Sequence, residues 1–564
     1  MQKFTTTPRL TTALATSATA LALLLAPTQR AEACGCFAPP DPTVPIVQAG
    51  EQIVFSHDDG MITAHIQIQY QGEANEFGWI LPLPSVPDMT LGTDELFTQL
   101  VSTTQPRYRL NRIFEDSCLA LPQSAGSTNE SFNNRDDGAS DPSIVVKQDS
   151  IGPFDYAVLK ADDRTEMFEW LTENSYFIPT GTEDVVGPYI HEGAYFLALK
   201  LRKGNDTGDI QPVVLRYASD LPMIPIILTQ VAANPDMGIR VWVLGEHRAI
   251  PRNYRHTVLN EEYIDWSNAG QNYNDIVIAA TNEAPDGQSF VTEYAGSVDR
   301  MVNLLDGPGR FGVRSDYESI TDPGLFLQQM RADNFPWSSG VLSAIKTHIP
   351  YPASLASQNI SEDDFYNSAD YYLTFYREDN PALFENYEFD FQHMELTAQL
   401  WDRVVKPTLE AGSLFRTNKK MTRMYTTLSP EEMSKDPTFS FNPSLPDVDN
   451  EHSADFTVLC DGSGNIDGSG ILRLPDGRRF FINDQAAWSA RNRTGVPYSR
   501  RIELLREEGA PMVEIDNATR LSDSDANSSG CTCLAGDTPA SGSSTALSFA
   551  ALAAAGLLLR RRRR

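Results

Sequence analysis

The sequence predicts an α+β protein whose strands pair mostly antiparallel, and three observations favour this class. Apolar residues alternate with polar ones from Ile62 to Gln71, which is typical of a half-buried strand. Apolar residues between Ser361 and Val405 recur at the spacing of amphipathic helices. Asp476-Gly477 separates two short apolar runs and has the composition of a tight hairpin turn. We therefore expect a mostly antiparallel β N-terminal region, a helical insertion and a C-terminal β-meander.

Local signals locate the elements of the N-terminal region. His65 falls on the polar face of the strand at 62–71 and is expected at the surface. Thr93 is expected to cap a short helix, and Asp163 with Glu166 has the spacing of a capping box before another. Further strands are expected at 77–83, 144–160, 194–202, 212–217 and 238–245.

Beyond Asp306 the pattern becomes helical. Ser361 and Asp364 have the spacing of a capping box, and the apolar stripe from Phe391 to Val405 is expected to end before Pro407. Aromatic residues between 365 and 391 follow helical spacing, which favours a packed core over a sugar-stacking surface.

These patterns divide the chain into six regions. They are a signal peptide, a β-rich region, a mainly helical region, a β-meander region, an acidic linker and a C-terminal tail, at residues 1–33, 34–305, 306–440, 441–515, 516–530 and 531–564 respectively.

The N-terminus has the organisation of a secretory signal peptide. Lys3 and Arg9 supply the positive segment, 18–26 the apolar core, and Ala31-Glu-Ala33 a small-x-small cleavage site before Cys34. A lipoprotein signal acylated at Cys34 is the alternative, although Ala31 and Glu32 depart from the sequence that such signals use. Either interpretation predicts export.

The C-terminus has the organisation of a sorting or anchoring signal. The uncharged run 546–559 has 14 residues, so a helix would cover about 21 Å of a hydrocarbon core of roughly 30 Å. Arg560–Arg564 resists translocation and favours a C-terminus that stays inside. A short transmembrane segment with a basic stop, behind small residues, is typical of a removable signal, and a permanent tail anchor is the alternative.

The tail also resembles a known sorting signal. Cys531-Thr-Cys533, a Gly/Ser/Ala spacer, Gly556-Leu-Leu-Leu559 and the arginine block are similar to the MYXO-CTERM tail. The resemblance implies cleavage near Cys531 or Cys533 by a C-terminal sorting protease, after the secretion machinery has exported the chain. The membrane contact would be made through this tail, and the implied location is the cell surface or outer membrane.

The charge of the chain excludes one class of partner. The formal net charge is −30, and it becomes −37 once the signal peptide, with a net charge of +2, and the five C-terminal arginines are removed. A protein this acidic repels nucleic acid, so no nucleic-acid partner is expected.

Four cysteines lie outside the tail: Cys34, Cys36, Cys118 and Cys460. In an oxidising compartment this number favours one or two disulfides over a zinc site, since no histidine stands at ligand spacing. Four cysteines can form two disulfides in three different ways. A bridge from Cys34 or Cys36 to Cys118 is favoured, because Cys34 and Cys36 are too close in the chain to pair with each other without strain.

Several stretches resemble one bacterial family. They are 64–70, 77–84, 241–245, 250–254, 264–266 and 423–430. These residues are similar to the DUF2330 family of exported bacterial proteins, which has no established function. The resemblance extends from Cys34 to about Val513 and implies no catalytic residues.

The densest polar stretch, Glu246–Asp265, follows a buried-looking strand. His247, His256 and Asp265 could serve acid–base chemistry there, and a solvated connection whose charges pair with one another is the alternative. A second charged stretch, Arg473–Arg506, carries eight arginines that could bind an anionic glycan or pair with the protein's own carboxylates.

The sequence contains one candidate metal-binding loop. Asp461, Asn465 and Asp467 place oxygen atoms at alternate positions, as calcium loops do. The glycine and glutamate that complete such a loop are absent, so a glycine-rich turn is the alternative. No cofactor other than this calcium ion is expected.

The sequence therefore favours a surface-displayed, envelope-associated protein with a binding or structural role and an unidentified ligand. The alternative is a secreted hydrolase that uses the histidines and carboxylates of 246–265. Whether the protein is an enzyme stays open at this stage.

Overall fold

The computed structural model describes residues 47–71, 78–114, 145–174, 176, 182–201, 210–231, 233–460, 466–482 and 495–518. The fold is α+β, as expected. None of the helices in these ranges is long and apolar enough to cross a membrane. The signal peptide and the tail, including 546–559, lie outside them.

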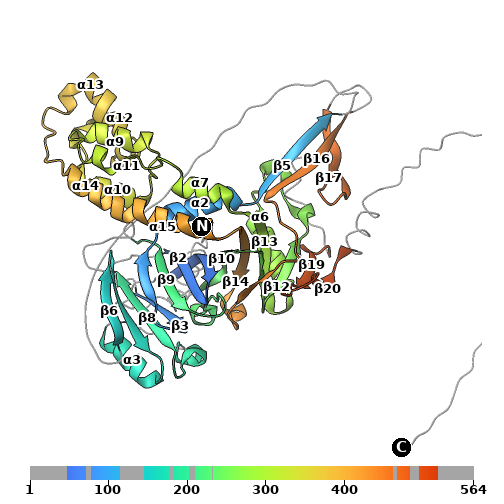
Figure 1. Ribbon diagram of the computed structural model, residues 1–564. Helices are drawn as coiled ribbons and strands as arrows, with labels where there is room; N and C mark the ends of the chain where they lie inside the picture. Colours follow the sequence, from blue (N-terminus) through green and yellow to red (C-terminus); the bar gives the residue numbers. More distant parts are fainter. Residues whose placement is uncertain are drawn as a thin grey trace, which may run out of the picture.

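A ten-stranded sheet forms the centre of the molecule (Figure 1). Neighbouring strands within this sheet pair antiparallel, except for the parallel pairs β1–β10 and β12–β13. In spatial order the strands are β20 (Met512–Asp516), β19 (Ser499–Leu504), β12 (Arg255–Leu259), β13 (Ser289–Ser297), β14 (Lys420–Leu428), β10 (Ala233–Gly245), β1 (Val47–Asp58), β2 (Met61–Gln71), β9 (Val213–Ala218) and β4 (Asp88–Leu91).

One face of this sheet packs on a smaller antiparallel sheet. The alternating residues Ile53 and Phe55 of β1 enter a core shared with the second sheet. That sheet has the order β3 (Gly78–Leu83), β8 (Tyr195–Leu201), β7 (Phe154–Lys160) and β6 (Val145–Ile151). The helix α3 (Arg164–Glu173) lies between β7 and β8 in the chain. Asp163 caps α3 by accepting hydrogen bonds from the backbone N–H groups of Thr165 and Glu166.

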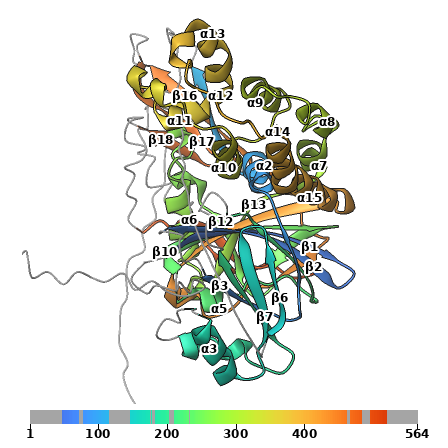
Figure 2. The same cartoon turned by 90° about the vertical axis from the view of Figure 1, so that its left-hand side faces the viewer.

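Helices cover the opposite face. Val54 and Trp242 pack there against α2 (Asp94–Thr104), α7 (Asp299–Asp306) and α15 (Lys406–Thr417), which lie above the sheet in Figure 2. His65 on β2 points to this face and is only 3% exposed. The prediction of a surface histidine was wrong, because alternation separates two faces and here both are covered.

The helical region has its own core, built around Tyr317, Phe326 and Phe365. The predicted capping box at Ser361 and Asp364 is present. The principal helices are α8 (Arg314–Tyr317), α9 (Pro323–Ala332), α10 (Ser339–His348), α11 (Glu362–Asn367), α12 (Ala369–Tyr371) and α14 (His393–Leu400).

The helix does not end before Pro407. A π-helical turn at Trp401–Val405 joins α14 to α15, and Pro407 lies in the first turn of α15. Proline inside a continuous helix removes one backbone hydrogen bond and crowds the preceding turn, and the π-helical turn lies directly before Pro407.

A third sheet contains the C-terminal meander. Its strands are β18 (Arg479–Ile482), β17 (Ile466–Arg473), β16 (Glu451–Cys460) and β5 (Arg107–Phe114), and β5 pairs parallel with β16. Gly477 has a φ of 89°, which suits the turn between β17 and β18. The buried face of this sheet packs on Trp266 and on Ile276 of α6 (Tyr273–Thr281).

The buried carboxyl group of Glu51 should make the stability of the protein depend on pH. It shares the β1 face of Ile53 and Phe55, is 5% exposed, and burial raises its pKa from 4.5 to about 7. The folded state therefore binds this proton more tightly than the unfolded state. Its contribution to stability is complete below pH 4.5 and is lost as the pH rises through 7, by about 3 kcal/mol in total.

Glu51→Gln should accordingly flatten the fall in the free energy of unfolding between pH 5 and pH 8, as measured by urea denaturation. Glu246→Gln, at an exposed position, is the control and should keep the wild-type slope. Equal slopes for wild type and Glu51→Gln would contradict the assignment.

Candidate functional site

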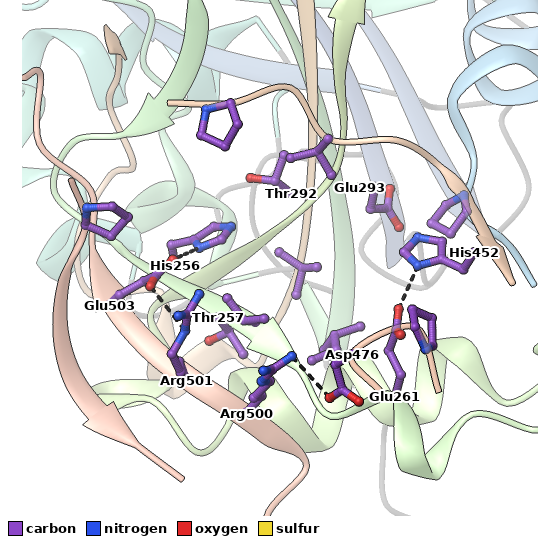
Figure 3. A pocket seen from close by; sticks show the side chains of 18 of the residues that line it. His256, Thr257, Glu261, Thr292, Glu293, His452, Asp476, Arg500, Arg501 and Glu503 are labelled. Atoms are coloured by element: carbon purple, nitrogen blue, oxygen red, sulfur yellow. Dashed lines mark hydrogen bonds and ion pairs between the residues drawn. The ribbon is translucent and has the colours of Figure 1, made fainter. Parts of the chain in front are cut away.

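A cavity of about 630 Å³ lies where β12, β13 and β19 of the large sheet meet β5 and β16 of the third sheet (Figure 3). Apolar atoms make up most of its accessible wall, and the polar or charged side chains of about half of the lining residues converge on it. The apolar lining includes Leu259, Val291, Leu445, Val448, Leu505 and the prolines Pro106, Pro446, Pro475 and Pro511. Apolar walls with a few directed polar groups are the usual composition of a small-molecule site.

His256 and Glu503 form a buried pair at one wall. They are cross-strand partners on β12 and β19, so their side chains leave the sheet on the same side. His256 Nδ1 lies 3.0 Å from Glu503 Oε1, and the two side chains are 8% and 4% exposed. The imidazole points into the cavity in Figure 3, and its Nε2 has no hydrogen-bond partner.

The charge states of this pair follow from their surroundings. Burial lowers the pKa of His256, and the nearby positive charges of Arg248 and Arg501 lower it further, against the influence of Glu503. Burial acts to raise the pKa of Glu503, but the hydrogen bond from His256 and the two arginines outweigh it and bring the pKa below its usual value. At neutral pH a neutral imidazole therefore donates Nδ1–H to an ionised carboxylate and leaves a lone pair on Nε2.

Two arginines flank the pair. Arg248 Nη1 donates to the backbone oxygen of Pro446 at 3.1 Å, and its Nη2 donates to Thr292 Oγ1 at 3.2 Å. Its Nε has no partner. Arg501 Nε lies 3.7 Å from Glu503 Oε2, an ion pair that is too long to be a hydrogen bond.

The facing wall carries a second imidazole–carboxylate pair. His452 Nδ1 lies 2.6 Å from Glu261 Oε1. The His452 ring stacks on Tyr108 with centroids 4.8 Å apart, which fixes its orientation. Nearby, Asp476 accepts from Arg478 Nε at 2.8 Å and lies 3.1 Å from Arg500 Nη1.

Glu293 contributes to the cavity wall from β13 and is fixed from β14. Its carboxylate forms a buried ion pair with Arg423, whose Nη1 also donates to Thr104 Oγ1 at 3.3 Å. Burial, assisted by Glu293, raises the pKa of the neighbouring Tyr273 well above its usual value. This phenol therefore stays protonated.

The structure separates the three predicted acid–base residues. His256 lies in the cavity, whereas His247 is exposed in the turn between β10 and β11 (Arg248–Pro251). Asp265 caps the turn at Trp266–Asn268 and accepts hydrogen bonds from Ser267 and Asn268. These three residues consequently do not form one cluster.

The predicted calcium residues are only partly described. Asp461 and Asn465 lie outside the described residues, as does the side chain of Asp467. In the described part of the chain no three His, Cys, Asp or Glu side chains are grouped to hold a metal ion.

The remaining predicted site residues lie mostly in the ends of the chain. Ala33, Cys34, Cys36, Cys118, Cys531 and Cys533 are outside the described ranges. Cys460 is the last residue of β16. The disulfide pairing and the processing sites therefore stay predictions.

Sequence reasoning missed Glu503, Thr292 and His452. Arg500 and Arg501 belong to the predicted arginine-rich stretch, and both pair with the protein's own carboxylates. The sequence pattern identified the arginine-rich stretch but could not show which residues pair across the fold. His256 and Glu503, for example, are 247 positions apart in the chain.

Fold and cavity together define an α+β protein with a preformed cavity at the meeting of two sheets. Residues 29–310 match the model of a family described as an uncharacterized protein conserved in bacteria (DUF2330). The chain therefore belongs to the DUF2330 family. Comparisons with curated proteins and with solved structures gave no match.

The matched segment is shorter than the resemblance noted in the sequence, and 423–430 lies beyond it. It contains His256, Arg248 and Tyr108, whereas Glu503 and His452 lie outside it. Both parts of the chain therefore build the cavity.

Proposed function

We propose that this protein is exported, displayed on the cell surface through its processed tail, and binds a small, largely apolar molecule in the cavity. The signal-peptide pattern and the basic C-terminal block support the location. The composition of the cavity supports binding over a purely structural role.

The observation that carries the binding role is a set of unpartnered polar atoms on residues that line the cavity: Arg248 Nε, His256 Nε2, Glu293 Oε1, Arg501 Nε and Glu503 Oε2. Arg248 is 7% exposed and His256 6% exposed. A buried polar group without a partner costs about 1–3 kcal/mol, and native proteins rarely contain several beside one cavity. A ligand that supplies the missing partners offsets this cost.

A hydrolase is the second candidate function, and the His256–Glu503 pair favours it. An imidazole held by a carboxylate at Nδ1, with Nε2 unengaged, is the arrangement of a general base. The nucleophile activated by the base would be a water molecule, since the two threonine hydroxyls of the wall are already engaged. The hydroxyl of Thr257 donates to Ser289, and that of Thr292 accepts from Arg248. This version of the hydrolase uses neither His247 nor Asp265.

The location can be tested by mass spectrometry of the protein isolated from surface fractions of its host. The expected mature chain begins near Cys34 and ends near Cys531 or Cys533. Replacing both tail cysteines with serine should leave export intact and release the protein from the surface, and the two single variants identify the cysteine used. Recovery of the intact chain from the cytosol, with both ends present, would contradict the proposal.

The binding site can be tested by filling the cavity. Leu445→Trp places a large ring in the cavity wall, so Nile red, a neutral apolar dye, should bind at least about tenfold more weakly in a fluorescence titration. Leu409→Trp on α15 makes the same change at a residue outside the cavity lining and should bind dye like wild type. Equal dye affinity in both variants would exclude the cavity as the site.

The hydrolase can be tested with a p-nitrophenyl ester. The expected rate is constant above pH 7, since burial places the pKa of His256 below its usual value of 6.5. It should fall by about 100-fold or more in His256→Gln, and His247→Gln is the matched control at an exposed histidine. A rate that is equal in wild type and His256→Gln would eliminate the enzyme and leave the binding role.

A further inference from the structure

We propose that the ligand of the cavity is a monocarboxylate with an apolar body, and that Arg248 binds its carboxylate. This inference rests on the proposed binding function and specifies the chemical class of the ligand.

The first step is the charge of the cavity wall, where each carboxylate already has a cationic or imidazole partner. Glu503 contacts His256 and Arg501, Glu261 contacts His452, Asp476 contacts Arg478 and Arg500, and Glu293 contacts Arg423. Each carboxylate of the wall therefore already has a partner for its charge, although Glu293 Oε1 and Glu503 Oε2 accept no hydrogen bond.

Arg248 differs from the other cations of the wall. Its two recorded acceptors, the Pro446 oxygen and Thr292 Oγ1, are neutral. No carboxylate among the described residues makes an ion pair with it. Glu503 and Asp447 are close enough to influence it, but Glu503 contacts His256 and Asp447 contacts Lys420. Arg248 is thus a buried guanidinium that no carboxylate of the described residues contacts directly.

A buried charge of this kind is costly unless an opposite charge accompanies it. Burial lowers the pKa of Arg248, but a guanidinium remains protonated at physiological pH. The missing counterion must therefore come from outside the described residues, and the cavity beside Arg248 has room for a ligand that brings it.

The geometry selects a carboxylate. The unpartnered Nε–H, which is buried in the structure, and the neighbouring Nη2, which also donates to Thr292, lie on one edge of the guanidinium. A carboxylate that reaches such an edge can accept two parallel hydrogen bonds from it. A dianion would bring a second negative charge beside Glu503 and Glu293, with no further unpaired cation in the described wall. The apolar lining, which includes Val291, Leu445 and Leu505, then accommodates the rest of the ligand.

The test is calorimetric titration of the mature protein with decanoate, decan-1-ol and decylamine, which share a chain and differ in charge. We expect decanoate to bind about 10- to 100-fold more tightly than decanol, because a hydrogen-bonded charge pair contributes about 1.5–3 kcal/mol. Decylamine should bind more weakly than decanol. Decanoate affinity no greater than that of decanol would overturn the proposal.

Arg248→Met should remove the preference for decanoate, so that decanoate binds no more tightly than decanol. Arg252→Met is the matched control, because Arg252 is half-exposed and pairs with Glu507 at 3.2 Å; it should bind both probes like wild type. If Arg248→Met no longer binds decanol either, the Arg248→Lys variant distinguishes a lost charge from a damaged cavity. A preference for decanoate that Arg248→Lys retains supports the assignment, and its loss overturns the assignment.

These results separate the two proposals. Nile red and decanol binding that Leu445→Trp blocks, without any preference for decanoate, would keep the binding function and reject the carboxylate. Absence of dye, decanol and decanoate binding in wild type would reject both.

Discussion

Strand β14 is the constraint on which the rest of the structure depends. It lies between β10 and β13, which do not pair with each other, and so joins the two halves of the ten-stranded sheet. Every residue from Met421 to Leu428 is buried. The ion pair between Arg423 and Glu293 links β14 to β13 in the interior, where removal of either partner would leave a buried charge uncompensated.

The helical region follows from this topology. The chain leaves the sheet at Ser297, builds the separate helical core, and returns at Lys420 to insert β14. The family match ends at residue 310, before that return. The second half of this sheet is therefore joined to the first by a strand that the family model does not cover.

The cavity forms where β12, β13 and β19, on one side of β14, meet the third sheet. Its polar groups come from strands that are distant in sequence, and most of them are held by partners across a strand pair or between sheets. The two imidazole–carboxylate pairs, His256–Glu503 and His452–Glu261, face the same space from opposite walls. Five of the residues that line this space, Arg248, His256, Glu293, Arg501 and Glu503, each have one buried polar atom without a hydrogen-bond partner. We propose these atoms as contacts for a ligand.

The sequence alone determined the local structure and the class of fold. Alternation located the strands, and Thr93, Asp163 and Ser361 cap helices where predicted, because these signals act within a few residues. The tertiary structure decided the strand order, the parallel β5–β16 pair and the burial of His65. It also decided that His256, and neither His247 nor Asp265, lies in the cavity. Such features depend on contacts between residues far apart in the chain, which no local pattern encodes.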